Sequence, residues 1–288
     1  GDRAANLPEV IEAIITLSIN VWQDKRSVQC ELRQMQAYMP GKAFIAECQR
    51  QSEKISNAML STLCLPDQKA ENIERMTLEQ AKTVLASEFE KGYQGILIGV
   101  HTLAALKLLN VHLAVMHAQL DYVLEKTEDI RGFNTLVMVP DWANIAFSPR
   151  LIVAMDGMLS DGERVLVKEK FPKARVIEVT DMRTQSSSAA CRLLPDDSSL
   201  RQLYKALRQR EKTDCTMNVL SAATGLEEDM IRCGMRIMQQ LGLIEYTLYP
   251  LSFKVLPSGK VSLEDSSLRA KLIRMKDEGG NRFDAGRM

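Results

Sequence analysis

The sequence predicts a mixed α/β, multidomain protein, and three patterns carry this prediction. Two alternating β-prone runs flank a short polar turn within residues 14–32, which is the pattern of a β-hairpin. Short apolar runs alternate with helical patterns over residues 94–185, which indicates a parallel sheet covered on both faces. Three helical patterns and two short strands over residues 196–262 are typical of a winged-helix module.

The composition excludes a protein whose whole surface is built to hold nucleic acid. Lys+Arg and Asp+Glu both number 37, so the net charge is zero and only a local basic patch remains open. No apolar run reaches the roughly 18 residues of a membrane helix, and no signal segment opens the chain. We therefore expect a cytoplasmic protein without a membrane partner; the number of copies that associate stays open.

The six cysteines are widely scattered and include no C-x-x-C pair. Zinc sites usually need close ligand pairs, and small secreted folds need denser disulfides. We therefore expect free, mostly buried thiols in a reducing compartment.

Residues 1–40 are predicted to form the hairpin, with Val28, Cys30 and Leu32 on a half-buried face. A lone two-stranded hairpin is marginal in water, so it should pack on the rest of the chain or on further strands. The candidate nucleic-acid-binding residues combine an aromatic for base stacking with polar and basic groups on the outward face. They are Trp22, Lys25, Arg26, Gln29 and Arg33. The alternative is that Trp22 only caps the end of the hairpin and that the charges are solvated.

Residues 41–93 are predicted to be linker helices. Apolar residues recur at helical spacing over residues 41–64, and Pro66 ends that pattern. Thr77 with Gln80 forms a capping-box pattern, which predicts a second helix to about Lys91.

The α/β segment, residues 94–185, is predicted to be a scaffold without chemistry of its own. Strands are expected over 95–100, 111–116, 135–139, 151–155 and 175–179, and helices over 102–109, 119–126 and 161–171. The order of elements is distantly similar to the second core domain of helicases. There is no phosphate-binding P-loop or G-x-G-x-x-G fingerprint, and the paired arginines of helicases are absent around residues 154–162.

No cluster of carboxylates and histidines of the kind that a two-metal nuclease needs is visible in the sequence, so we expect no catalytic or metal-binding residue in this chain. The Ser186–Ser188 run and the Pro195–Ser199 stretch are interpreted as a flexible linker.

The C-terminal segment is predicted to hold helices over 200–210, 218–223 and 226–241 and a hairpin over 244–247 and 253–256. A charged tail is expected over 263–288, with a helix over 267–276 and a disordered last dozen residues. Thr224 with Glu227 is interpreted as a second capping box. Glu228 can pair with Arg232 at i,i+4 spacing, and the acidic first turn disfavours base reading. Arg232, Arg236 and Gln239 are candidates for contact with a protein partner or a DNA backbone, the alternative being a plain packing module.

The hairpin resembles the end of the oligonucleotide-binding barrel of RecJ-type single-strand DNA exonucleases, where the run reads approximately Asn-x-Trp-x-Gly-x-x-Ser-x-Gln. The matching residues are Asn20, Trp22, Arg26, Ser27 and Gln29. Asp24 stands where the family has a turn glycine, so this chain departs from the family pattern at the turn. The order of the remaining segments is also similar to the back half of the long bacterial members.

The resemblance implies a 5′-to-3′ exonuclease whose catalytic core, with two Mn²⁺ or Mg²⁺ ions held by Asp-His-His motifs, would lie upstream of Gly1. It implies single-stranded DNA as a ligand of the barrel and single-strand-binding protein as a partner of the C-terminal domain. Two hypotheses follow. The chain is either the non-catalytic DNA-binding and regulatory region of a recombination and repair exonuclease, or an interaction module that docks a protein and touches no DNA.

Overall fold

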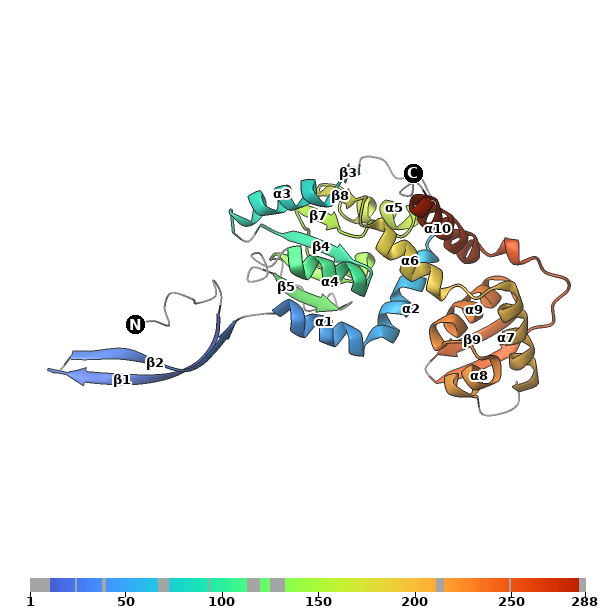
Figure 1. Cartoon of the computed structure of the whole chain (residues 1–288), viewed down its shortest axis with the longest axis horizontal. Helices are drawn as coiled ribbons and strands as arrows, with labels where there is room; N and C mark the ends of the chain where they lie inside the picture. The colour runs from blue at the N-terminus through green and yellow to red at the C-terminus, as the bar shows by residue number, and fades with distance from the viewer. Residues whose placement is uncertain are drawn as a thin grey trace.

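The computed structural model describes residues 11–23, 25–37, 40–66, 73–92, 94–112, 120–124, 133–210, 215–248 and 250–284. It shows a mixed α/β chain of three parts: a long N-terminal ribbon, a sheet flanked by helices, and a C-terminal helical module (Figure 1). Figure 1 also shows that the ribbon projects away from the other two parts.

The ribbon consists of β1 (Ile11–Trp22) and β2 (Lys25–Ala37), which pair antiparallel along their whole length. The predicted hairpin is therefore confirmed, and Trp22 faces Lys25 across a two-residue turn. Gln23 in this turn has a φ of 49°, and Asp24 lies outside the described residues. The expected half-burial is wrong, because every described side chain of β1 and β2 is exposed.

Two helices, α1 (Pro40–Arg50) and α2 (Ser52–Leu63), replace the single helical run expected over 41–64, with the break at Gln51. The capping box before α3 (Leu78–Phe89) is confirmed, because Thr77 accepts from the Gln80 amide and the Gln80 side chain accepts from Thr77. These helices are not a linker. Ile55 of α2 belongs to the core of the sheet and Leu63 to the core of the C-terminal module, so α2 joins both.

The central sheet has six parallel strands among the described residues, in the order β3-β8-β7-β4-β6-β5. The strands are β3 (Glu74–Met76), β4 (Ile96–Val100), β5 (Asp121–Leu124), β6 (Thr135–Met138), β7 (Leu151–Ala154) and β8 (Arg175–Val179). Four of these were expected from their continuous apolar runs, which suit strands buried on both faces. In the sheet, β6 and β5 lie on one side of β4, and β7 and β8 lie on its other side.

Alternate residues of β4 enter two separate cores, as the period of a strand requires. Ile96 and Ile98 pack with α3 and with α4 (Leu103–His112), whereas Leu97 packs against the opposite layer. That layer contains the 3₁₀ turn η3 (Trp142–Asn144) and helix α5 (Asp161–Lys170). The prediction of a parallel sheet covered on both faces is thereby confirmed.

Two segments of the sheet domain differ from expectation. Residues 121–124 form the edge strand β5 instead of part of a helix, because pairing with β6 overrides the local pattern. The strand expected over 111–116 begins inside α4, and residues 113–116 lie outside the described residues. The short strand β3 has no apolar run and was not expected.

The predicted serine linker is instead part of helix α6 (Arg183–Leu193). The Ser186 hydroxyl lies 2.9 Å from the carbonyl oxygens of both Asp156 and Arg183, to which it can donate. Ser186 and Ser187 are buried. The serine-rich composition therefore does not mark a loop here. The small hydroxyl groups allow close packing of the helix, because backbone carbonyl oxygens accept their hydrogen bonds.

The C-terminal module contains the three expected helices, α7 (Asp197–Arg210), α8 (Met217–Thr224) and α9 (Glu228–Gln240), and the expected hairpin of β9 (Ile244–Leu248) and β10 (Leu251–Val255). The second capping box is wrong. Thr224 ends α8, where Gly225 adopts a φ of 70°, and Glu227 precedes α9 without a side-chain cap.

The charged tail expected over 263–288 contains helix α10 (Ser267–Asp284), which lies beside α6 (Figure 1). Leu268, Leu272 and Met275 recur at helical spacing and are buried in the core of the C-terminal module. The helix predicted over 267–276 is therefore confirmed. The helix continues to Asp284, so disorder of the last dozen residues is wrong for the described part of that stretch.

Candidate nucleic-acid interface

The register of the ribbon separates its side chains into a polar face and an apolar face, because directly paired residues share a face. The polar face pairs Thr16 with Glu31, Ser18 with Gln29, and Trp22 with Lys25. Arg33 also belongs to this face, since its Nε donates to the Thr16 hydroxyl at 3.1 Å. Four of the five predicted binding residues are therefore brought together: Trp22, Lys25, Gln29 and Arg33.

Arg26 is the exception, because it pairs with Val21 on the apolar face near the turn. Strand alternation alone could have revealed this separation, since Lys25 and Arg26 are neighbours in the sequence. At the tip, Trp22 is 72% exposed and so presents its indole to solvent. Farther along, an ion pair of 3.0 Å links Arg33 to Glu31, which partly neutralises that end of the polar face.

The apolar face of the ribbon is continuous and uncovered within the described residues. Ile15 faces Leu32, Leu17 faces Cys30, and Ile19 faces Val28. These six side chains are all exposed. Contiguous apolar surface of this kind marks an interaction surface or a face that packs against further structure.

The candidate residues of the C-terminal module do not form one exposed patch. Arg232 is buried and makes ion pairs of 2.7 Å to Glu228, 2.7 Å to Asp229 and 2.9 Å to Glu53 of α2. The predicted pairing of Glu228 with Arg232 is confirmed. Arg236 is half-buried and donates to the Ser61 hydroxyl of α2, whereas Gln239 is exposed. Arg232 and Arg236 thus connect α9 to α2.

A buried polar cluster lies where β4 and β7 end, at the point where the strand order reverses. His101 directly follows β4, and its Nδ1 lies 3.0 Å from Asp156 Oδ1. Its Nε2 lies 2.7 Å from Glu163 Oε1 in the first turn of α5. Glu163 also accepts from the Trp142 indole at 2.6 Å and from the Leu159 amide at 2.6 Å. All groups of this cluster have partners.

The electrostatics of the cluster favour a charged imidazole. Burial alone would lower the pKa of His101, but the carboxylates of Glu163 and Asp156 outweigh it and raise this pKa to about 10. Burial acts to raise the pKa of Glu163, yet its interactions with His101 and its other donors hold it below the usual value. The imidazole is therefore a cation at neutral pH and donates from both nitrogens.

In open α/β sheets this switch point is the usual place for a ligand. Here His101, Asp156 and Glu163 are each 0% exposed, so the crevice is filled by the protein's own side chains. The residues between β4 and α4 are His101 and Thr102, which leaves no room for a phosphate loop. From the sequence, only the position of Asp156 directly after a predicted strand points to this cluster, because the pairing of His101 with Glu163 depends on tertiary packing.

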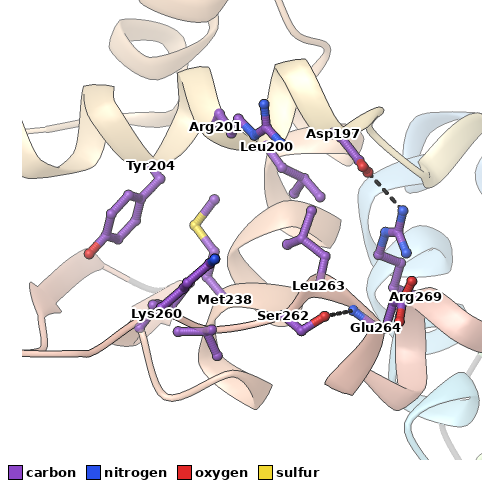
Figure 2. A pocket seen from close by; sticks show the side chains of 12 residues that line it. Asp197, Leu200, Arg201, Tyr204, Met238, Lys260, Ser262, Leu263, Glu264 and Arg269 are labelled. Carbon is purple, nitrogen blue, oxygen red and sulfur yellow. Dashed lines mark hydrogen bonds and ion pairs between the residues drawn. The ribbon is translucent and has the colours of Figure 1, made fainter.

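A cavity of about 620 Å³ lies in the C-terminal module between α7, α9 and the loop that precedes α10. Figure 2 shows Leu200, Met238 and Leu263 beside charged side chains that include Arg201 and Lys260. An ion pair of 2.7 Å between Asp197 and Arg269 closes one end. The volume and mixed lining are suited to a peptide side chain or a small organic group.

All six cysteines are free; Cys48 and Cys233 are buried and Cys30 is exposed on the ribbon. In the ranges that the structure describes, no three His, Cys, Asp or Glu side chains are grouped so as to hold a metal ion. No helix there combines the length and the apolar character that crossing a membrane requires. No family model, curated protein or solved structure matches this chain, so its function is inferred from the residues and contacts described above.

Proposed function

We propose that this chain binds single-stranded DNA through the polar face of its N-terminal ribbon. The observation that carries the proposal is the exposed Trp22 at the tip, with Lys25 opposite it and Gln29 and Arg33 farther along the same face. Base stacking on an aromatic tolerates any sequence, and neighbouring basic groups follow the phosphate backbone. Arg26 lies beside the turn on the opposite, apolar face, from which it can contact a phosphate.

A more specific fold type for each part of the chain follows from the resemblance of the hairpin to the end of an oligonucleotide-binding barrel. In such a barrel the apolar face, with Leu17 and Val28, would pack inward against further strands, and the polar face would meet the nucleic acid. The parallel sheet would be a helicase-like scaffold without nucleotide chemistry, because its switch point is filled by His101. Helices α7 to α9 with β9 and β10 would form a winged-helix module.

The whole protein would be a RecJ-type 5′-to-3′ exonuclease of DNA recombination and repair, and this chain its non-catalytic DNA-binding and regulatory region. The Mn²⁺ or Mg²⁺ ions of such an enzyme would belong to its catalytic core, and no step of metal chemistry is assigned to the described residues. The role of the ribbon would be to hold a strand for cleavage elsewhere in the enzyme.

Fluorescence anisotropy with a labelled oligothymidylate tests the proposal. The affinity should fall as salt rises, because basic side chains displace counterions from the backbone. Trp22→Ala should weaken binding by about 5-fold to 100-fold, which is the worth of one stacked base. Lys173→Glu is the control, because Lys173 is exposed in the turn before β8 and distant from the ribbon in the sequence. Binding that is equal in all three proteins would place the DNA site elsewhere.

A second candidate is a protein-interaction module without DNA contact, and the cavity between α7 and α9 favours it (Figure 2). Its apolar floor and charged rim are features of a peptide-binding site. Absence of oligonucleotide binding at low salt would favour this candidate over DNA binding. A cross-linking partner that is lost on Lys260→Glu, but retained on Trp22→Ala, would support it directly, because Lys260 is an exposed lining residue of the cavity.

A further inference from the structure

A second cavity, of about 230 Å³, lies at the carboxyl end of the parallel sheet between β3, α5, α6 and α10. Residues from both the sheet domain and the C-terminal helix line it. They are Arg75, Leu159, Ser160, Asp161, Arg164, Arg183, Lys271, Arg274 and Met275. This cavity is separate from the ribbon and from the larger cavity of the C-terminal module, with which it shares no lining residue.

Cations dominate the lining. Five of the nine lining residues are Arg or Lys and one is a carboxylate, Asp161. They come from four different elements: Arg75 from β3, Arg164 from α5, Arg183 from α6, and Lys271 with Arg274 from α10. Lys271 and Arg274 are three residues apart on α10 and therefore share one face of that helix. Segments distant in sequence are thus folded so that positive charge converges.

The buried Glu178 lies beneath this lining and organises three of the guanidinium groups. Arg164 donates to both of its carboxylate oxygens, at 3.1 and 2.6 Å. Arg183 approaches Glu178 at 3.5 Å and Arg75 at 3.8 Å. Arg164 also pairs with Asp161 at 2.6 Å. The lining and its floor together contain five cationic side chains and two carboxylates.

Bringing like charges together costs free energy, and the cost rises where side chains are removed from water. Arg164 and Lys271 are almost fully buried here. A multivalent anion in the cavity would offset this repulsion, and the planar fork of arginine matches the oxygens of a phosphate. The volume lies below the range of about 300–1,000 Å³ that encloses a drug-sized ligand, so a phosphoryl group fits better than a whole nucleotide.

We propose that this cavity is a phosphate-binding site that receives a phosphoryl group, carried by a small polyphosphate or by a nucleic-acid strand. Arg75 and Arg274 are exposed and supply the entrance. Arg164 and Lys271 form the buried end and contribute positive charge there, since Arg164 already donates to Glu178 and Asp161 and Lys271 donates to the Leu65 carbonyl oxygen. The ligand would connect α10 to the sheet domain, because it contacts cations of both. The site is independent of the ribbon and does not depend on base stacking.

Isothermal titration of the full chain with pyrophosphate, in a buffer without phosphate or sulfate, tests the proposal. We expect saturable binding and a rise in melting temperature. Arg274→Glu and Arg75→Glu should each weaken binding by about tenfold or more, which is the worth of one charge-assisted hydrogen bond. Lys173→Glu carries the same charge change in the turn before β8, opposite the carboxyl end, and should bind pyrophosphate like the unchanged protein.

Melting temperatures measured without ligand distinguish phosphate binding from a purely structural role of these cationic side chains. Arg274→Ala should lose most of the rise in melting temperature caused by pyrophosphate, with this rise measured against the variant's own melting temperature without anion. Trp22→Ala should leave pyrophosphate binding unchanged, so failure of the DNA proposal and failure of this one give different results. Absence of saturable binding, or binding unaltered by Arg75→Glu and Arg274→Glu, would overturn the assignment.

Competition identifies the source of the phosphoryl group. Displacement of pyrophosphate by a 5′-phosphorylated oligonucleotide, but not by the same strand with a 5′-hydroxyl, indicates a strand terminus. Displacement by both indicates a backbone phosphate, and displacement by neither indicates a small polyphosphate. Each of these outcomes retains the phosphate site, provided that Arg274→Glu weakens the competing ligand as well.

Discussion

The His101 imidazole Nε2 lies 2.7 Å from Glu163 Oε1 in a site that is closed to solvent. Through this contact, and through the contact of Nδ1 with Asp156, a single side chain connects the end of β4 with β7 and α5. The place where other α/β sheets bind a ligand is thus used for stability in this chain. Because folding raises the pKa of His101 and lowers that of Glu163, the free energy of unfolding should depend on pH in a defined way.

His101 should make the protein less stable in mild alkali. Its pKa is raised from 6.5 to about 10 on folding, so its contribution is complete below pH 6.5 and is lost as pH rises toward 10. The lowered pKa of Glu163 has the opposite sign: its contribution is present above 4.5 and is lost in acid, as pH falls through the folded value. Urea unfolding between about pH 2 and about pH 11 measures both limbs.

The matched variant is His101→Gln, which should cost about 3–5 kcal/mol because two buried carboxylates lose their cation. It should also remove most of the decline between pH 6.5 and 10. An alkaline decline that is the same in the variant and the unchanged protein would show that other groups cause it.

Gly162 should not tolerate alanine. A Cβ on Gly162 would collide with the backbone carbonyl oxygen of Pro66, where the end of α2 meets α5. We expect Gly162→Ala to destabilise by about 1–3 kcal/mol, although alanine is the better helix former. Gly259→Ala is the control, because its added Cβ meets nothing within 4 Å. Equal midpoints in thermal unfolding of the two variants would contradict the close packing of α2 on α5.

Arg232 should act in stability and not in DNA binding. Because it is buried and paired with Glu228, Asp229 and Glu53, Arg232→Ala should lower the free energy of unfolding by about 1.5–3 kcal/mol. The exposed Gln239 offers a control in Gln239→Ala, with a change within about 0.5 kcal/mol. Oligonucleotide affinity, measured below the melting transition, should be the same in both; a selective loss in Arg232→Ala would reassign this residue to the interface.

Cys30 should be the thiol that maleimide labels fastest under native conditions. It is exposed on the apolar face of the ribbon, whereas burial raises the pKa of Cys48 to about 12 and also raises that of Cys233. The thiolate is the reactive form, so the buried thiols should react slowly. Mass spectrometry of a timed reaction, with Cys30→Ser as the control, reports the order. Protection of Cys30 would mean that the apolar face is covered.

Much of the fold could be predicted because its signals are local. The buried strand β4, the capping box at Thr77 and the alternation of β2 each depend on residues within a few positions. The edge strand β5 and the serine-rich helix α6 were missed, because pairing with β6 and burial of Ser186 are decided by distant segments. The start of α10 was predicted as a helix, whereas the burial of Leu268, Leu272 and Met275 was not, because it depends on packing against distant segments.

The candidate sites divide in the same way. Trp22, Lys25 and Gln29 were proposed because an aromatic and polar groups lie close together around the turn, which is a local pattern, whereas the burial of Arg232 depends on Glu53 of another helix. The basic cavity around Glu178 could not be predicted at all, since its arginines and lysine come from four elements that only the tertiary fold brings together.

Tryptophan fluorescence tests the central proposal most directly, because the chain has two tryptophans in opposite environments. Trp22 is 72% exposed at the ribbon tip, and Trp142 is 1% exposed beside Glu163. Titration with an unlabelled oligothymidylate should quench the solvent-exposed component as a base stacks on Trp22, and Trp22→Phe should abolish that quenching. Quenching that persists in Trp22→Phe, or binding by anisotropy without any quenching of Trp22, would contradict the proposed role of the ribbon.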